Sequence, residues 1–132
     1  MDYEESLEEL EKTVCELIEE NELVPVIVEG EKDVHALRLL GLRGEIIMMH
    51  AGKSLPTFCD EIAERHGRVI LLTDWDRKGG QFMRLLKNNL SGRVVFDGDF
   101  RRRFASRASV KDVESLPAFI ATLRDAVNMR VR

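Results

Sequence analysis

Three carboxylates in this chain stand directly after apolar segments, where they are placed to act together. Glu29 follows the apolar residues of segment 23–30, and Asp74 and Asp76 follow those of segment 68–80. Two carboxylates about 4 Å apart repel by roughly 4 kcal/mol at an effective dielectric constant near 20, so a cluster of three either takes up protons or holds a cation. Because no cysteine or histidine set accompanies them, oxygen ligands favour a hard ion, Mg²⁺ or Mn²⁺, over zinc.

The elements that must position these carboxylates are alternating strands and helices. Short apolar runs predict strands at 23–30, 45–49, 69–72 and 93–96, and apolar residues at helical spacing predict a helix between each pair. Strict alternation with short connections implies a parallel sheet covered by helices on both sides. We therefore predict an α/β fold with a compact four-stranded parallel sheet. In such sheets ligands bind at the carboxyl ends of the strands, where all three carboxylates stand.

One extra helix is predicted at each end of this α/β core. Residues 2–20 carry an apolar stripe of Leu7, Leu10, Val14 and Leu17. This stripe either packs on the chain's own core or forms the seam of a homodimer. A basic segment precedes the final helix, which we expect to pack back on the same domain. The predicted divisions are the acidic helix at 1–22, the α/β core at 23–100, and the basic segment with the last helix at 101–132.

Composition limits the class of protein. The 132 residues are 44% hydrophobic and 33% charged, which is ordinary for one globular domain. No apolar run approaches the roughly 20 residues that span a bilayer, and the first residues are acidic, so we predict a cytoplasmic protein with no membrane partner. Cys15 and Cys59 lie on separate predicted helices and make neither a zinc site nor a disulfide framework, so we predict buried thiols.

The charge of the chain is unevenly distributed. The formal net charge is −4, from 24 acidic and 20 basic side chains. Residues 1–22 hold ten of the acidic side chains and one basic one, Lys12, which leaves 14 acidic against 19 basic residues in the rest. The body of the protein is therefore mildly basic, and nucleic acid is an expected partner.

Two segments resemble the Toprim domain, which topoisomerases, bacterial-type primases, old-type nucleases and small stand-alone proteins share. The sequence VPVIVEGEKDV at 24–34 is followed by VILLTDWDRKG at 69–79. The sequence features that these segments share with the family are a Glu-Gly pair after the first strand and an Asp-x-Asp motif after the third. The matching residues are Glu29, Gly30, Asp74, Asp76 and Gly79, with Asp33 where primase-like members often carry an aspartate.

The resemblance implies a Rossmann-like sheet and chemistry on phosphodiester bonds. It implies that Asp74 and Asp76 bind Mg²⁺, and that Glu29 acts as general acid or base or as a further metal ligand. Asp97 and Asp99 repeat the strand-then-Asp-x-Asp pattern. They are either additional acidic ligands, like the late acidic residues of primases, or turn residues after the last strand.

Further residues are candidates for contacts with nucleic acid. Gly30 and Gly79 either let the backbone approach a phosphate or are ordinary turn residues. Trp75 either stacks on a base or packs in the fold, and Lys53 is a candidate phosphate contact. His50 is expected to be a strand-end residue. The basic side chains predicted to contact phosphates are Arg77, Lys78, Arg101, Arg102 and Arg103.

Several reactions are compatible with an acidic metal site. Strand passage needs a tyrosine nucleophile, and the only tyrosine is Tyr3, outside the segments that resemble the family. Primer synthesis needs more domains than 132 residues provide. Our first hypothesis is a small Mg²⁺-dependent nuclease or related phosphotransferase acting on RNA or DNA, and the second is an accessory protein that binds metal and nucleic acid without catalysis. A third, an aspartyl-phosphate phosphatase, would need Thr or Val where Lys78 stands and leaves Glu29 without a role.

Overall fold

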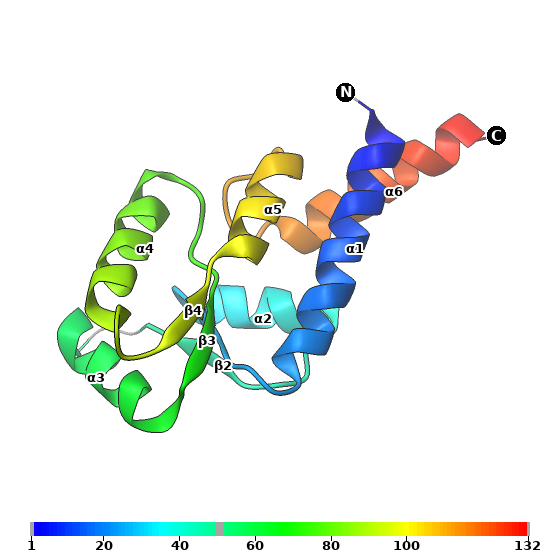
Figure 1. Ribbon diagram of the computed structural model, residues 1–132. Coiled ribbons are helices and arrows are strands. Elements are labelled where there is room, and N and C mark those ends of the chain that lie inside the picture. The colour runs from blue at the N-terminus through cyan, green and yellow to red at the C-terminus, as the bar shows by residue number, and fades with distance from the viewer. Residues whose placement is uncertain (1, 50–51, 132) are drawn as a thin grey trace.

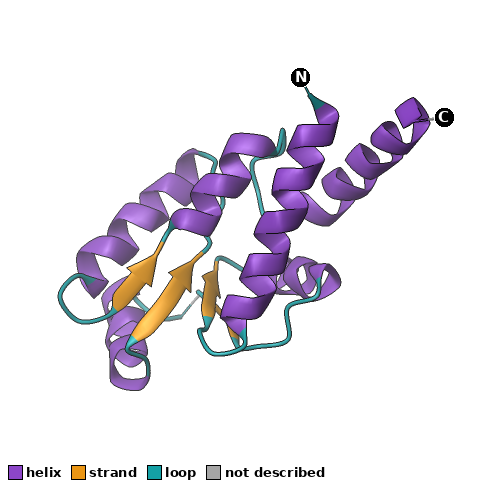
Figure 2. Ribbon diagram, turned by 45° about the vertical axis from the view of Figure 1, so that its right-hand side comes forward, coloured by secondary structure: helices purple, strands orange, loops and turns teal. Residues whose placement is uncertain are grey.

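Four strands of this chain form one parallel sheet in the order β2-β1-β3-β4. The computed structural model describes residues 2–49 and 52–131, so His50 lies outside the described residues. Figure 1 shows the sheet with helices on both of its sides, and Figure 2 shows strands that point in the same direction. The predicted α/β fold is therefore confirmed. The strands are β1 (Val26–Val28), β2 (Ile46–Met48), β3 (Arg68–Leu71) and β4 (Val95–Asp97).

Six helices surround the sheet in the described part of the chain. The helix α4 begins at Arg77 because Asp76 caps it: the Asp76 carboxylate accepts a hydrogen bond from the amide of Gly79. The helix α2 (Glu31–Leu40) ends at Gly41, which adopts a left-handed φ of 114°. The helices are α1 (Tyr3–Asn21), α2 (Glu31–Leu40), α3 (Leu55–Arg65), α4 (Arg77–Leu90), α5 (Asp99–Arg107) and α6 (Leu116–Val131).

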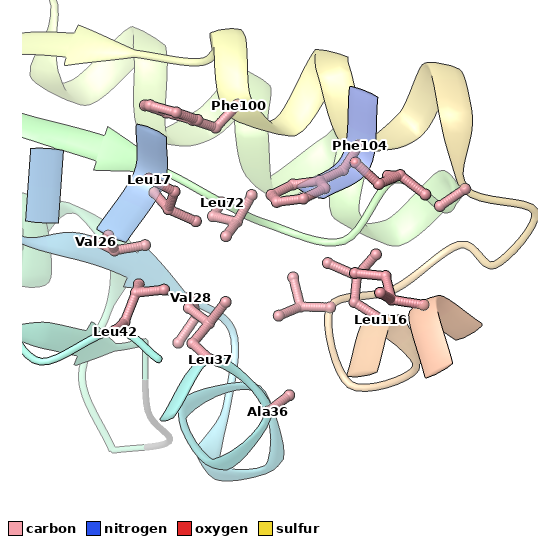
Figure 3. Close-up of a cluster of buried hydrophobic side chains, with 14 of the residues drawn as sticks. Leu17, Val26, Val28, Ala36, Leu37, Leu42, Leu72, Phe100, Phe104 and Leu116 are labelled. Carbon is pink, nitrogen blue, oxygen red and sulfur yellow. The ribbon is translucent and has the colours of Figure 1, made fainter. Parts of the chain in front are cut away.

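Alternate residues of the central strands enter two separate cores. Val26 and Val28 face the layer of α1, α2, α5 and α6, whereas Ile27 faces the layer of α3 and α4. This alternation follows from the two-residue period of a strand, and both faces of β1 are fully buried. Figure 3 shows the larger core, in which side chains from the sheet, from the N-terminal helix and from the last two helices meet. The labelled members include Leu17, Leu37, Leu72, Phe104 and Leu116.

The apolar stripe of α1 is buried within its own chain. Leu10 and Leu17 have no exposed surface and Leu7 is 8% exposed, because α1 packs on α5 and α6. A homodimer through α1 would consequently have to use another face of the helix, since this stripe is already covered.

Two details differ from the sequence-based predictions. The basic segment after β4 is the helix α5, whose Phe100 and Phe104, four residues apart, point into the larger core. Cys59 is buried as predicted, but Cys15 is exposed, because the inward positions of that turn of α1 belong to Thr13 and Leu17.

In the described residues, no helix combines the length and the apolar character that crossing a membrane requires.

Candidate functional site

The register of the sheet brings the predicted carboxylates together. Strand β1 lies beside β3, with Val26 opposite Ile70 and Ile27 opposite Leu71. Continuing this register places Glu29 opposite Thr73, one residue before Asp74. The contact is direct, because the Asp74 amide donates a hydrogen bond of 2.8 Å to Glu29 Oε2. The two carboxyl ends thus share one acidic edge, which we define as Glu29, Asp74 and Asp76.

Each carboxylate of the acidic edge is held by one backbone amide. Besides the bond from Asp74 to Glu29, Asp74 Oδ1 accepts from the amide of Val113 at 3.0 Å and Asp76 Oδ1 accepts from the amide of Gly79 at 2.7 Å. Within the described residues, the second oxygen of each carboxylate has no hydrogen-bond partner. One oxygen of each carboxylate is therefore left for a ligand.

Burial and mutual repulsion make the ionised carboxylates of the acidic edge less stable than their protonated or cation-bound forms. Burial raises the pKa of Asp74 to about 7, and the charges of Asp33, Glu29 and Asp112 add to this effect, against the hydrogen bond from Val113. Burial also raises the pKa of Glu29, although the bond from the Asp74 amide opposes the shift. A bound cation would relieve the same repulsion that a proton relieves at Asp74.

Asp33 and Gly30 form the start of α2 beside the acidic edge. Asp33 is 7% exposed, and its Oδ2 accepts a hydrogen bond of 3.1 Å from the Gly30 amide. Burial raises the pKa of Asp33. The Gly30 amide, predicted to approach a phosphate, thus already has a partner in the protein. Asp33 is a capping residue whose charge also acts on Glu29 and Asp74.

Gly79 is a site of close approach, but to the protein's own backbone. A Cβ atom at this position would lie 1.8 Å from the carbonyl oxygen of Asp74. The Thr73 hydroxyl also donates to the Gly79 carbonyl oxygen at 2.9 Å. Glycine here lets the first turn of α4 pack directly against the acidic edge.

Arg101 lies against the acidic edge from inside the fold. Its Nη2 donates to the Asp74 carbonyl oxygen at 2.8 Å and its Nε to the Thr73 carbonyl oxygen at 3.1 Å. Burial lowers the pKa of Arg101, while the nearby charges of Glu29, Asp74 and Asp76 oppose that shift. Arg101, which we predicted to contact phosphate, therefore binds the backbone of the acidic edge in the structure.

The other predicted cations divide into paired and unpaired residues. Arg102 forms an ion pair of 2.5 Å with Asp99, and Arg103 pairs with Glu16 of α1. Arg77 and Lys78, in the first turn of α4, have no ion-pair partner in the described part of the chain, and Lys78 lies over the ring of Phe82. These two side chains are the better candidates for phosphate contacts. Lys53 is paired with Glu61.

Asp97 and Asp99 lie apart from the acidic edge. In the pairing of β3 with β4, Asp97 stands opposite Ile70, four residues before Asp74. Four strand residues correspond to about 13 Å. Asp97 Oδ1 instead accepts a hydrogen bond from the amide of Asp99, which begins α5. Asp97 ends β4 and Asp99 begins α5, so the two residues bracket the turn after the last strand, close to the turn alternative of the sequence analysis.

Residues 108–115, between α5 and α6, complete the site and escaped prediction. Besides the bond from Val113 to Asp74, Trp75 donates from its amide to Lys111 at 2.9 Å and from Nε1 to Val110 at 2.6 Å. Trp75 also stacks on Phe104, so it packs in the fold. This loop brings Asp112 within electrostatic range of Asp74. No local pattern in residues 108–115 predicts these contacts, because they depend on backbone atoms far apart in the sequence.

The acidic edge suits a magnesium ion that keeps much of its water. Among residues 2–49 and 52–131, no three His, Cys, Asp or Glu side chains are grouped closely enough to enclose a metal ion. Mg²⁺ usually binds through one or two carboxylates, with water and phosphate oxygens as the remaining ligands. The open oxygens of Asp74 and Asp76, with Glu29 beside them, fit that manner of binding.

Comparisons with known proteins agree with this fold. The family model of the Toprim domain matches residues 24–108. A UPF0292 protein of Thermoplasma volcanium is 37% identical over 99 residues, covering 74% of this chain and 83% of its own length. A UPF0292 protein of Methanosarcina barkeri is 35% identical over 130 residues, covering 92% of this chain and 87% of its own.

A solved structure of a protein from Aquifex aeolicus has a similar fold. Its TM-score is 0.69 at 25% sequence identity, and the similarity covers 79% of this chain and 94% of that one. A Toprim domain indicates a metal-dependent function related to nucleic acid. With the sheet order, the acidic edge and the sequence matches in agreement, this chain belongs to the Toprim domain family and, within it, to the UPF0292 proteins.

Proposed function

We propose that this protein is a small Mg²⁺-dependent enzyme that cleaves phosphodiester bonds in nucleic acid. The observation that carries the proposal is the acidic edge, where one oxygen of each carboxylate is fixed by an amide and the other is open. Asp74 and Asp76 would hold the ion, which would neutralise charge on the phosphate when bound. Lys78 and Arg77 lie at the start of the next helix, where positive charge favours a phosphate.

Glu29 is the residue we assign to proton transfer. Its pKa is raised by burial, and this is the direction that suits a carboxyl group that must hold and release a proton. The Asp74 amide binds Oε2, which fixes the orientation of the carboxyl group and leaves Oε1 to protonate a leaving oxygen or to take a proton from water. Family membership supports this assignment over an aspartyl-phosphate phosphatase, in which Glu29 would have no role.

The test is cleavage of single- and double-stranded RNA and DNA with Mg²⁺ or Mn²⁺. Glu29→Gln keeps the size and the hydrogen-bond acceptor but cannot transfer a proton, so the rate should fall about 10²- to 10⁴-fold while binding persists. Glu31→Gln, an exposed residue two positions along the chain, is the matched control and should retain full activity. Cleavage that survives Glu29→Gln would remove the proposed role of Glu29.

A second outcome would favour the accessory function. The amide bonds to one oxygen of each carboxylate limit how many oxygens can reach one ion, which is compatible with weak metal binding without catalysis. If the wild-type protein cleaves no substrate with either metal, yet binds nucleic acid in a manner that depends on metal and on Asp74 and Asp76, the protein is a binding module. Trp75 is the only tryptophan in the chain, so its fluorescence can follow metal binding beside Asp74.

A further inference from the structure

A pocket opens next to the acidic edge and has a different chemical character. Its volume is about 420 Å³, within the range of roughly 300–1,000 Å³ usual for small-molecule sites. Glu29 forms part of its wall, so the pocket and the acidic edge share a side chain. The other described residues that line it are Met49, Lys53, Leu55, Phe58, Lys78 and Phe82.

The pocket combines apolar surface with two cations. Met49, Leu55 and Phe58 come from the loops and helix beyond β2, while Phe82 comes from α4. Phe82 is half-exposed and belongs to neither buried core, so its ring is not required to fill the interior. The Lys78 ammonium lies 5.5 Å from the centre of the Phe82 ring. A ligand for this pocket would therefore have an apolar body and negative charge.

We propose that this pocket holds the base of an unpaired nucleotide, with Phe82 as the stacking surface. The inference rests on the proposed function, and it names the substrate class: single-stranded nucleic acid or an unpaired end. Base–aromatic stacking contributes about 1–3 kcal/mol per base. Because Glu29 belongs both to the wall of the pocket and to the acidic edge, a nucleotide with its base in the pocket has its phosphate near that edge.

The position of the cations supports this orientation of the nucleotide. Lys78 lines the pocket and also acts electrostatically on Glu29, so its charge is close to both the pocket and the acidic edge. Lys53, in the loop between β2 and α3, lines the same pocket. The Lys78 ammonium has no ion-pair partner in the described part of the chain and can neutralise a phosphate that flanks the bound base, whereas Lys53 is paired with Glu61. A base in a duplex is stacked on both faces and paired along its edge, so it could enter only after being unpaired.

The test uses a single-stranded trinucleotide with 2-aminopurine at its centre, whose fluorescence falls when the base stacks. Titration is done in a chelator, so that no metal contributes. The wild-type protein should quench the probe, and Phe82→Ala should weaken binding about 10- to 100-fold, the equivalent of the stacking energy. The matched control is Leu85→Ala, an apolar residue on the same helix that is 46% exposed and outside the pocket.

Further variants separate the inference from the proposed function. Phe82→Leu keeps apolar volume and should also lose the quenching, while circular dichroism checks that each variant is folded. Asp76→Asn should not abolish the quenching, since Asp76 does not line the pocket and its substitution removes a charge that repels the phosphate. Quenching that depends on Phe82 in a protein that binds no metal would retain the pocket and reject the proposed function. Equal quenching by wild type and Phe82→Ala, or binding that disappears in Lys78→Gln but is insensitive to Phe82, would overturn the inference.

Discussion

The amide of Asp74 donates a hydrogen bond of 2.8 Å to the carboxylate of Glu29, and this bond joins the loops after the two central strands. Glu29 is thus an acceptor for the backbone as well as a candidate catalytic group. Any variant of Glu29 changes both roles unless it preserves the acceptor.

The first prediction compares two substitutions of Glu29 by their free energies of unfolding. Glu29→Gln keeps an acceptor for the Asp74 amide and removes a charge that repels Asp74, so it should be at least as stable as wild type. Glu29→Ala leaves the amide without its partner and should be less stable than Glu29→Gln by about 1–2 kcal/mol. Urea denaturation at pH 8 measures the difference. Equal stability of the two variants would show that the bond contributes nothing.

The second prediction concerns pH in the absence of metal. The pKa of Asp74 is raised to about 7 from 3.8, so the folded protein binds this proton more tightly than the unfolded chain does. The contribution to stability is complete below about pH 4 and is lost as pH rises through about 7. The wild-type protein should therefore lose stability between pH 5 and pH 8, and in Asp74→Asn this loss should be smaller by about 1–2 kcal/mol. The full pKa shift would give a larger difference, but solvent screens this partly exposed group.

Urea denaturation of both proteins in a chelator at pH 5 and pH 8 checks this prediction. The comparison with Asp74→Asn cancels other groups that titrate in the same range. A wild-type protein whose stability rises from pH 5 to pH 8 more steeply than that of Asp74→Asn would contradict it.

The fold was largely predictable from local patterns, whereas the order of the strands was not. Apolar runs of three or four residues between helical segments indicate the four strands, and the two strand-end motifs indicate the acidic residues. The side of β1 on which β3 lies depends on tertiary packing. Helical spacing in α4 predicts an inward face made of Phe82, Leu85, Leu86 and Leu90. In the structure Met83 is buried and Leu85 is exposed.

The parts of the site that escaped prediction depend on distant contacts. Helix α5 has four arginines in nine residues, so only Phe100 and Phe104 reveal its buried face. Arg101 looks like a surface cation in the sequence, and its bonds to Thr73 and Asp74 exist only because α5 packs beside β3. The bond from Val113 to Asp74 joins residues 39 positions apart.

A third prediction uses two neighbouring glycines. Gly79→Ala would place a Cβ 1.8 Å from the Asp74 carbonyl oxygen, so α4 must move away from the acidic edge. We expect a loss of stability of about 2 kcal/mol or more and weaker metal binding. Gly80→Ala meets no atom closer than 4.0 Å and should be neutral or stabilising by up to about 1 kcal/mol. Thermal melts and metal titration calorimetry of the pair test this, and a Gly79→Ala protein as stable as Gly80→Ala would contradict the packing argument.

The fourth prediction distinguishes Arg101 from its neighbour. Arg101→Ala removes charged hydrogen bonds to two carbonyl oxygens and should cost about 1.5–3 kcal/mol. The loss should be larger at pH 8 than at pH 5, because Arg101 also stabilises the ionised carboxylates of the acidic edge. Arg102, whose side chain is 70% exposed, is the control, and its substitution by Ala should cost less than about 1 kcal/mol. Chemical denaturation at the two pH values decides, and equal losses for both variants would refute the distinction.

The fifth prediction concerns the salt dependence of nucleic-acid binding. Replacing the unpaired Arg77 and Lys78 by Gln should weaken binding to all sequences alike and reduce the salt slope by about 0.7–0.9 for each phosphate that the variant no longer neutralises. Arg103→Gln is the control, since Arg103 is paired with Glu16, and it should leave the slope unchanged. Fluorescence anisotropy over a range of salt concentrations provides the slope. Sequence-dependent losses would mean that Arg77 and Lys78 contact bases.

The packing of α1 sets an order of events during synthesis. Its ion pairs join Glu5 to Arg107 and Glu11 to Arg124, residues 102 and 113 positions apart, and its apolar stripe is covered by α5 and α6. The helix therefore leaves the ribosome long before its partners, with Leu7, Leu10 and Leu17 still exposed to water. Contacts this distant are costly to close and form late. We expect the acidic face of α1 to keep the nascent chain from associating in this interval, and pulsed hydrogen exchange should find the α1 amides among the last to become protected.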